Sequence, residues 1–146
     1  MTPQEAKNEQ YYLSSDFWFY KGVILSQKEQ SNSALQCYIQ ALKIDRDHLP
    51  SIFNLACNYE KLNKLESAKE QFLHAIQVNP KWQEALFGIG LVCIKLKQYA
   101  EAVTYLNRAL LVKEDQNIRY LLALAYKNNG DFKDSLSIFA PIFPTE

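Results

Sequence analysis

Small and large apolar residues recur along this chain with a period of 34 residues. Each copy has an alanine, a large apolar residue four positions later and a second alanine three positions after that. On a helix these positions share one face, where small residues admit a close neighbour and the large residue fills the remaining space. The three copies are Ala34, Tyr38 and Ala41; Ala68, Phe72 and Ala75; and Ala102, Leu106 and Ala109.

A second set of columns lies upstream of each copy and predicts a partner helix. A column here is a set of residues that align when the copies are shifted by 34 positions. The first column is apolar, the second is small and the third holds residues able to pack, and short polar turns separate these positions from the helix that carries the alanines. A fourth, weaker copy follows at a shift of 33 residues. Each unit is therefore predicted to be two helices. The columns are Trp18, Ile52 and Leu86; Gly22, Ala56 and Gly90; and Leu25, Tyr59 and Cys93, and the fourth copy has Leu122, Ala123, Tyr126, Ser135 and Phe139.

Residues that favour helix ends stand where this pattern needs them. Serine and aspartate side chains can cap helix N-termini, proline fits a first turn or ends a helix, and glycine suits a C-terminus. The expected positions are Ser14, Ser15 or Asp16 and Ser31 or Ser33 at the first two helix starts, Pro50 early in the third helix, Pro80 after the fourth, and Gly130 with Asp131 in the last turn.

This pattern resembles the tetratricopeptide repeat, best over residues 49–82, and departs from it where Arg46 and Glu114 replace the usual proline. The resemblance implies an all-α, right-handed superhelical solenoid of about four helix pairs. The expected division is an N-terminal arm or short helix at 1–14 and repeats at 15–48, 49–82, 83–115 and 116–146, the last incomplete and without a clear capping helix.

The first helix of each pair lines an inner groove in this family. The position after the Trp18 column is aromatic in all four units, and three lysines lie near the groove's rim. The resemblance thus implies binding of a partner's peptide or amphipathic helix. Two alternatives stay open: the aromatic rings pack between repeats, and the lysines complement helix dipoles. The residues assigned to the groove are Phe19, Val23, Phe53, Asn54, Cys57, Lys61, Phe87, Leu91, Lys95, Tyr120, Leu124 and Lys127.

One subtype of the family clamps the C-terminal carboxylate of chaperones. Asn54 fits its middle column, but the positions that should carry the flanking charges hold uncharged or acidic residues. Without those charges a carboxylate is poorly held, so we predict no chaperone-tail clamp. The departing positions are Phe19, Val23, Glu84 and Gly88.

Composition argues against several classes of protein, among them nucleic-acid-binding, membrane-spanning and secreted proteins. Lys plus Arg and Asp plus Glu both number 16, so no net positive field favours nucleic acid. No apolar run reaches the roughly 18 residues of a membrane span. Residues 1–10 lack the apolar centre of a secretory signal, and the three cysteines are too few and too widely spaced for a disulfide framework. The expected location is the cytoplasm.

Residue patterns for catalysis are absent from the sequence. His48 is expected in the turn between the first two units and His74 on the second helix of the second unit, and neither has metal-ligand spacing. No glycine-rich phosphate loop and no nucleophile elbow occurs. A reactive thiol at Cys57 is disfavoured because no base lies near it in sequence. We therefore predict no enzyme activity, no catalytic residue, no metal and no cofactor.

The leading hypothesis is an adaptor or scaffold that binds another protein. The N-terminal segment is expected either to form a short helix that docks on the first unit through Ala6, Tyr12 and Leu13, or to be a flexible arm that occupies the groove of another copy. A second hypothesis is therefore self-association, through this arm or through the apolar end near Phe139 and Phe143. A third is that the chain is the targeting domain of a larger protein.

Overall fold

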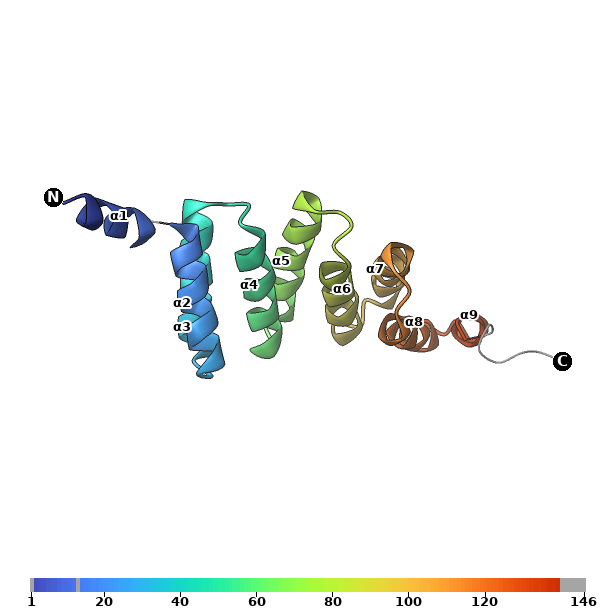
Figure 1. Ribbon diagram of the computed structural model, residues 1–146. Helices are drawn as coiled ribbons and strands as arrows, with labels where there is room; N and C mark the ends of the chain where they lie inside the picture. The colour runs from blue at the N-terminus through green and yellow to red at the C-terminus, as the bar shows by residue number, and fades with distance from the viewer. Residues whose placement is uncertain (1, 13, 140–146) are drawn as a thin grey trace. The chain divides into compact units, whose positions relative to one another are not determined.

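The computed structural model describes residues 2–12 and 14–139, and within them every regular element is an α-helix (Figure 1). This confirms the all-α class. Leu13 and Phe143, named above for the two ends of the chain, lie outside the described residues. The helices are α1 (Pro3–Tyr12), α2 (Ser15–Gln27), α3 (Ser31–Ile44), α4 (Leu49–Lys61), α5 (Leu65–Val78), α6 (Gln83–Lys95), α7 (Tyr99–Val112), α8 (Gln116–Asn128) and α9 (Phe132–Ser137).

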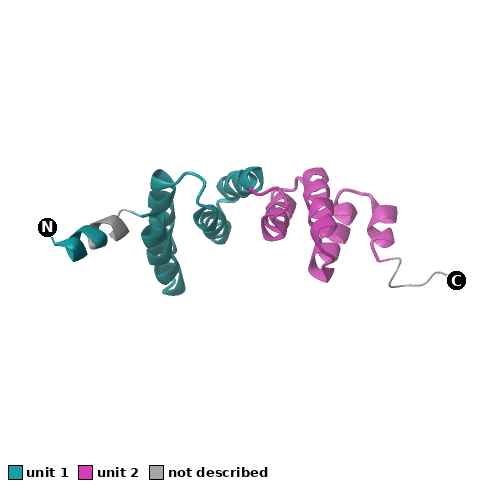
Figure 2. Cartoon of the chain, turned by 45° about the horizontal axis from the view of Figure 1, so that its top comes forward, with its two compact units in different colours: residues 1–78 teal, residues 79–146 magenta. Residues whose placement is uncertain are grey.

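The chain divides into two compact units, residues 1–78 and 79–146 (Figure 2). In unit 1, α2 packs on α3, α3 on α4 and α4 on α5; in unit 2, α6 packs on α7, α7 on α8 and α8 on α9. Each helix therefore contacts mainly its neighbours in the chain, which is the packing of helical repeats.

In each helix pair shown by these contacts, a glycine of the first helix packs against the large apolar side chain of the second helix. Gly22 faces the ring of Tyr38, and Gly90 faces the side chain of Leu106, so closely that an added Cβ would overlap them. Tyr38 and Leu106 are buried, as are the alanines beside them.

A recurring tight turn joins the two helices of each pair. Its second residue has positive φ, and the N–H of its third residue donates to the carbonyl five residues earlier. This 6→1 bond satisfies a carbonyl at the end of the first helix. The positive-φ residues are Glu29, Asn63, Lys97 and Gly130.

The helix starts follow the sequence only in part. Ser14 caps α2 by accepting a hydrogen bond from the N–H of Phe17 at 3.1 Å, and Pro50 lies in the first turn of α4, as expected. The expected cap of α3 by Ser31 or Ser33 is wrong, because the tight turn places Gln30 at the N-cap and Ser31 already inside the helix. Asp131 occupies the N-cap of α9 without a capping hydrogen bond.

Candidate functional site

The first-helix row is the set of groove residues assigned from the sequence on α2, α4, α6 and α8. In unit 1, Phe19 and Val23 of α2 pack against the buried cluster that includes Tyr38 and Leu55. The Phe19 ring centroid lies 6.1 Å from that of Tyr38 and 5.7 Å from that of His48. Both side chains are only half-buried, so one edge is held by the core while the other remains accessible.

Phe53 of α4 is anchored in the same way. Its ring meets the buried ring of Phe72 edge to face, with centroids 5.8 Å apart and planes at 70°. Phe53 itself remains half-buried. The sequence left open whether this ring contacts a ligand or packs between repeats. The ring packs on the second helix of its own pair, and its half-exposed surface leaves ligand contact possible.

Polar groups border this row in unit 1. The amide of Asn54 donates to the Tyr38 hydroxyl at 3.4 Å, and Lys61 is exposed. Burial, and to a lesser extent the Glu60 carboxylate, raises the pKa of the Cys57 thiol to about 11. Since the thiolate is the nucleophile, a thiol that stays protonated at neutral pH is unsuited to covalent chemistry.

Unit 2 carries its own part of the row. Phe87 and Leu91 of α6 and Leu124 of α8 are half-buried, whereas Tyr120 is 64% exposed. Lys95 and Lys127 lie in the last turns of α6 and α8, where a positive charge complements the helix dipole. Tyr120 is therefore the most accessible ring of the row.

A chain of hydrogen bonds that the sequence analysis missed joins α2 to α4. His48 Nε2 lies 2.8 Å from Asp16 Oδ1, and His48 Nδ1 lies 2.7 Å from Ser51 Oγ. The order of residue types resembles a hydrolase triad, but Ser51 is fully buried and cannot meet a substrate. We interpret this chain of hydrogen bonds as a structural link, and no local pattern in the sequence indicates it.

The second histidine is also tied to an acid. His74 Nε2 on α5 lies 3.1 Å from Asp47 Oδ1 in the turn before α4. Among residues 2–12 and 14–139, no three His, Cys, Asp or Glu side chains come together as metal ligands. Both histidines therefore serve the junction between the first two helix pairs.

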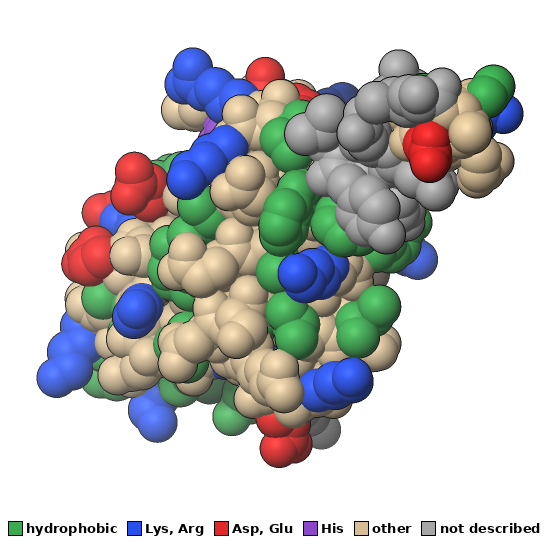
Figure 3. All heavy atoms as spheres, turned by 90° about the vertical axis from the view of Figure 1, so that its left-hand side faces the viewer, with side chains coloured by type: hydrophobic (Ala, Val, Ile, Leu, Met, Phe, Trp, Pro, Cys, Tyr) green, Lys and Arg blue, Asp and Glu red, His purple; other side chains and the backbone are tan. Residues whose placement is uncertain are grey.

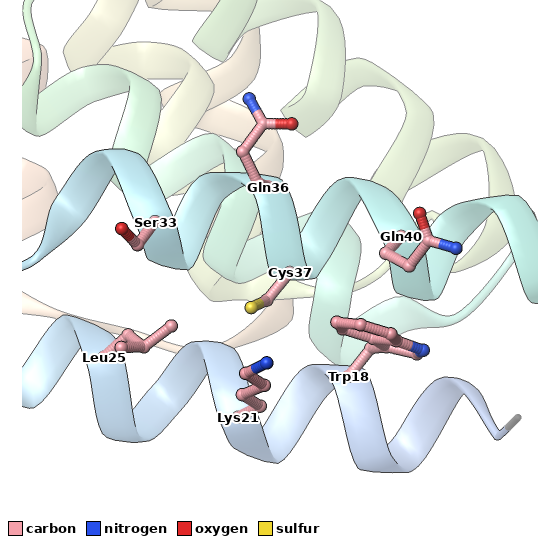
Figure 4. A pocket seen from close by; sticks show the side chains of 7 residues that line it. All are labelled: Trp18, Lys21, Leu25, Ser33, Gln36, Cys37 and Gln40. Carbon is pink, nitrogen blue, oxygen red and sulfur yellow. The ribbon is translucent and has the colours of Figure 1, made fainter. Parts of the chain in front are cut away.

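A groove of about 510 Å³ lies between α2 and α3 (Figure 4). Lys21 points toward α3, and its Nζ lies 5.1 Å from the centre of the Trp18 ring. The sequence analysis used Trp18 only as a packing column, although the spacing of Trp18, Lys21 and Leu25 places all three on one helix face. The lining residues are Trp18, Lys21, Leu25, Ser33, Gln36, Cys37 and Gln40.

Basic side chains do not gather into one patch on the face drawn in Figure 3, where they alternate with hydrophobic and polar side chains. Such a surface lacks the basic stripe typical of nucleic-acid binding. Within the described residues, no helix combines the length and apolarity that a bilayer crossing needs.

Comparison with known proteins identifies relatives that match most of this chain but are much longer than it. The chain is 22% identical over 124 residues to the peroxisomal targeting signal receptor of Candida albicans, covering 85% of this chain and 21% of that protein. It is 26% identical over 145 residues to the human protein O-mannosyl-transferase TMTC3, covering 84% of this chain and 16% of that protein. The chain thus spans about a fifth or less of these relatives' lengths.

Solved structures share the fold. YrrB, described as a TPR protein with an unusual peptide-binding site, superposes with a TM-score of 0.83 at 23% identity over 97% of this chain and 73% of that one. A tetratricopeptide repeat protein from Parabacteroides merdae gives 0.80 at 27% identity over 88% and 50%. Two family models, both described as tetratricopeptide repeat, match residues 15–48 and 53–117. The chain belongs to the tetratricopeptide repeat family.

Proposed function

We propose that this chain is a protein–protein interaction module whose first-helix row binds a peptide or amphipathic helix of a partner. The observation that carries the proposal is an aromatic ring at the same position in every first helix, accessible at one edge and, in unit 1, held by packing at the other. These rings are Phe19, Phe53, Phe87 and Tyr120.

Anchored rings suit binding because little conformational freedom is lost when a partner docks. Phe19 and Phe53 already pack against Tyr38 and Phe72, so their rotamers are largely set before binding. Aromatic residues also give large contact area and are frequent hot spots of interfaces. A partner would supply apolar side chains at helical or alternate spacing to contact these rings.

The charges beside the row favour an acidic partner. Lys61, Lys95 and Lys127 lie in the last turns of α4, α6 and α8, next to the apolar positions of the row. Acidic residues flanking the apolar anchors of a partner would be attracted by these ammonium groups. No catalytic step is part of this proposal.

The proposal also places the module in a reducing compartment, with the cytoplasm as the expected one. Cys37 and Cys57 are free thiols, which supports such a location. If the chain belongs to a longer protein, the module would bring that protein to its partner. The division into repeats at 15–48, 49–82, 83–115 and 116–146 is part of the same proposal.

Site-specific photocrosslinking tests this function. A photoreactive phenylalanine analogue replaces Tyr120, which is 64% exposed, in one variant. In the control it replaces Leu111 of α7, which lies outside the row and is even more exposed, at 87%. Both are irradiated in cell extract, and crosslinked peptides are identified by mass spectrometry. We expect position 120 to capture one recurring segment with apolar residues and acidic flanks.

The outcome against the proposal is equally clear. Equal capture of unrelated peptides from positions 111 and 120 would show that the first-helix row binds proteins no more specifically than any exposed apolar residue. In that case the rings serve packing alone.

A further inference from the structure

A cavity of about 410 Å³ lies where α6 begins and α7 ends, inside unit 2 and outside the first-helix row. The side-chain amide of Gln83 joins the two helices there, because it donates to the Ala109 carbonyl at 3.0 Å and to the Lys113 carbonyl at 2.6 Å. The cavity therefore belongs to a well-tied part of the fold. Its lining residues are Pro80, Lys81, Leu86, Arg108, Leu111 and Val112.

The lining carries two cations and no carboxylate. The guanidinium carbon of Arg108 lies 5.6 Å from the centre of the Tyr105 ring, and one of its nitrogens donates to the Pro80 carbonyl at 3.5 Å. Since a guanidinium has five N–H donors, others remain for a ligand. In the part of the chain that the structure describes, no acid pairs with Lys81 or Arg108.

The equivalent positions of unit 1 hold an acid and a base. A shift of 34 residues relates Lys81 to Asp47 and Arg108 to His74. In unit 1, His74 Nε2 lies 3.1 Å from Asp47 Oδ1. The repeat thus brings these two positions into hydrogen-bond contact in unit 1, whereas unit 2 fills both with positive groups.

The charge at position 81 is also unfavourable for the helix that follows it. Asp47 precedes the N-cap of α4 and Lys81 precedes the N-cap of α6. A helix N-terminus carries partial positive charge, so the carboxylate of Asp47 is stabilising there and the ammonium group of Lys81 is not. An external carboxylate between Lys81 and Arg108 would supply the negative charge that unit 1 provides from its own chain.

Apolar surface adjoins these two cations. Leu111 is 87% exposed and Val112 is 42% exposed. The counterparts of Leu111 in the two earlier repeats are polar, namely Gln77 and Lys43. A cationic pair beside an exposed leucine is complementary to a peptide that combines an acidic side chain with a large apolar one.

We propose that this cavity is a second peptide-binding site, which takes a partner segment with an aspartate or glutamate next to a large apolar residue. The side-chain carboxylate accepts charge-assisted hydrogen bonds from Lys81 and Arg108. The apolar residue packs on Leu111 and Val112. No lining residue belongs to the first-helix row, so the two sites bind independently, and a segment crosslinked from position 111 would differ from the one captured at position 120.

An NMR titration of the isotope-labelled 146-residue chain tests the site. The probe is the peptide acetyl-Glu-Leu-Glu-Leu-amide, which is blocked at both ends so that all its carboxylates are side chains. Its matched control is acetyl-Gln-Leu-Gln-Leu-amide. We expect saturable shifts of the amide signals of residues 81, 108, 111 and 112, with a dissociation constant on the order of 1 mM and at least about fivefold weaker binding of the glutamine peptide.

One substitution restores the charge pattern of unit 1. In Lys81→Asp the new carboxylate is placed to pair with Arg108 as Asp47 pairs with His74, so the urea midpoint should be kept or raised. The glutamate peptide should bind this variant at least about tenfold more weakly. Arg108→Gln removes the other cation without adding an acid and should weaken binding as well. Lys133→Asp, the same charge change at an exposed lysine of α9, should bind like the wild type.

The titration separates this site from a general charge effect and from the first-helix row. Equal binding of the glutamine peptide, undiminished binding by Lys81→Asp and Arg108→Gln, or an equal loss in Lys133→Asp would each overturn the proposal. So would shifts confined to residues of the first-helix row. Urea denaturation of each variant confirms that a loss of binding is measured on folded chain.

Discussion

Two glycines determine how closely the helices of a pair approach. A Cβ added at Gly22 would lie 2.6 Å from Tyr38 Cε1, and one added at Gly90 would lie 2.4 Å from Leu106 Cδ2. We expect Gly22→Ala to lower the free energy of unfolding by up to about 2 kcal/mol, since overpacking costs about 1–3 kcal/mol and the better helix propensity returns up to about 1 kcal/mol. Urea denaturation measures the change.

The ring of Tyr38 provides the control for this prediction. In a Tyr38→Ala background the ring atoms that the new Cβ would meet are gone, so Gly22→Ala should become stabilising there. A Gly22→Ala variant that is already stabilised in the wild-type background would contradict the close approach.

Burial at Cys57 predicts low thiol reactivity. Its pKa is raised from the ordinary 9.0 to about 11, so ionisation favours the unfolded state and this contribution to stability is lost as pH rises from 9 through 11. We expect iodoacetamide to modify native Cys57 at pH 8 at least about tenfold more slowly than urea-unfolded chain. Peptide mass mapping gives the rate, and equal rates would show that the thiol is not protected.

At the scale of single elements, the tight turns store strain. Glu29 and Lys97 have φ near +60° without being glycine. A left-handed residue with a Cβ costs about 1–2 kcal/mol, against a smaller entropic cost for glycine, so Lys97→Gly should raise the free energy of unfolding by up to about 1 kcal/mol. Asn63→Gly is the matched control and should gain less, because asparagine tolerates this conformation. Destabilisation by Lys97→Gly in urea would refute the strain.

The start of α8 depends on one capping side chain. Asp115 Oδ1 accepts hydrogen bonds from the N–H groups of Asn117 at 2.8 Å and Ile118 at 3.1 Å. Asp115→Ala should therefore lower the free energy of unfolding by about 1 kcal/mol. Asp131→Ala is the control at an N-cap with no capping bond, and thermal unfolding should rank it clearly below Asp115→Ala in effect.

The helices that carry the 34-residue repeat could be predicted from the sequence, whereas the contacts between helices could not. The columns at Gly22 and Tyr38 predict a helix pair because small and large residues alternate at fixed spacing. The cap of α3 was mispredicted because the left-handed Glu29, rather than a serine side chain, ends the turn. The link between Asp16 and His48 was missed because a contact 32 residues apart leaves no local pattern.

The candidate site was predictable only as a row of positions. Sequence spacing places Phe53 and Tyr120 at equivalent positions of two first helices, but it does not say how far each ring is covered. That depends on the neighbouring helix: Phe72 covers one edge of Phe53, whereas Tyr120 stays 64% exposed. The groove between α2 and α3 was missed for the same reason.

At the scale of the whole molecule, each unit is built from contacts between successive helices. Such an architecture repeats its surfaces along the chain and offers a partner several similar anchors rather than one deep pocket. Binding energy in this arrangement is concentrated in the few rings that a partner fully covers. We therefore expect the affinity for the partner to fall sharply when Tyr120, the most exposed ring of the first-helix row, is removed.

The affinity of the captured partner segment for wild-type and altered chains tests the central claim most directly. The segment crosslinked at position 120 is synthesised and titrated into wild type, Tyr120→Ala and Leu111→Ala. We predict at least about tenfold weaker binding for Tyr120→Ala, or about 1.4 kcal/mol, and unchanged binding for Leu111→Ala. Equal affinity of Tyr120→Ala and the wild type would contradict binding by the first-helix row.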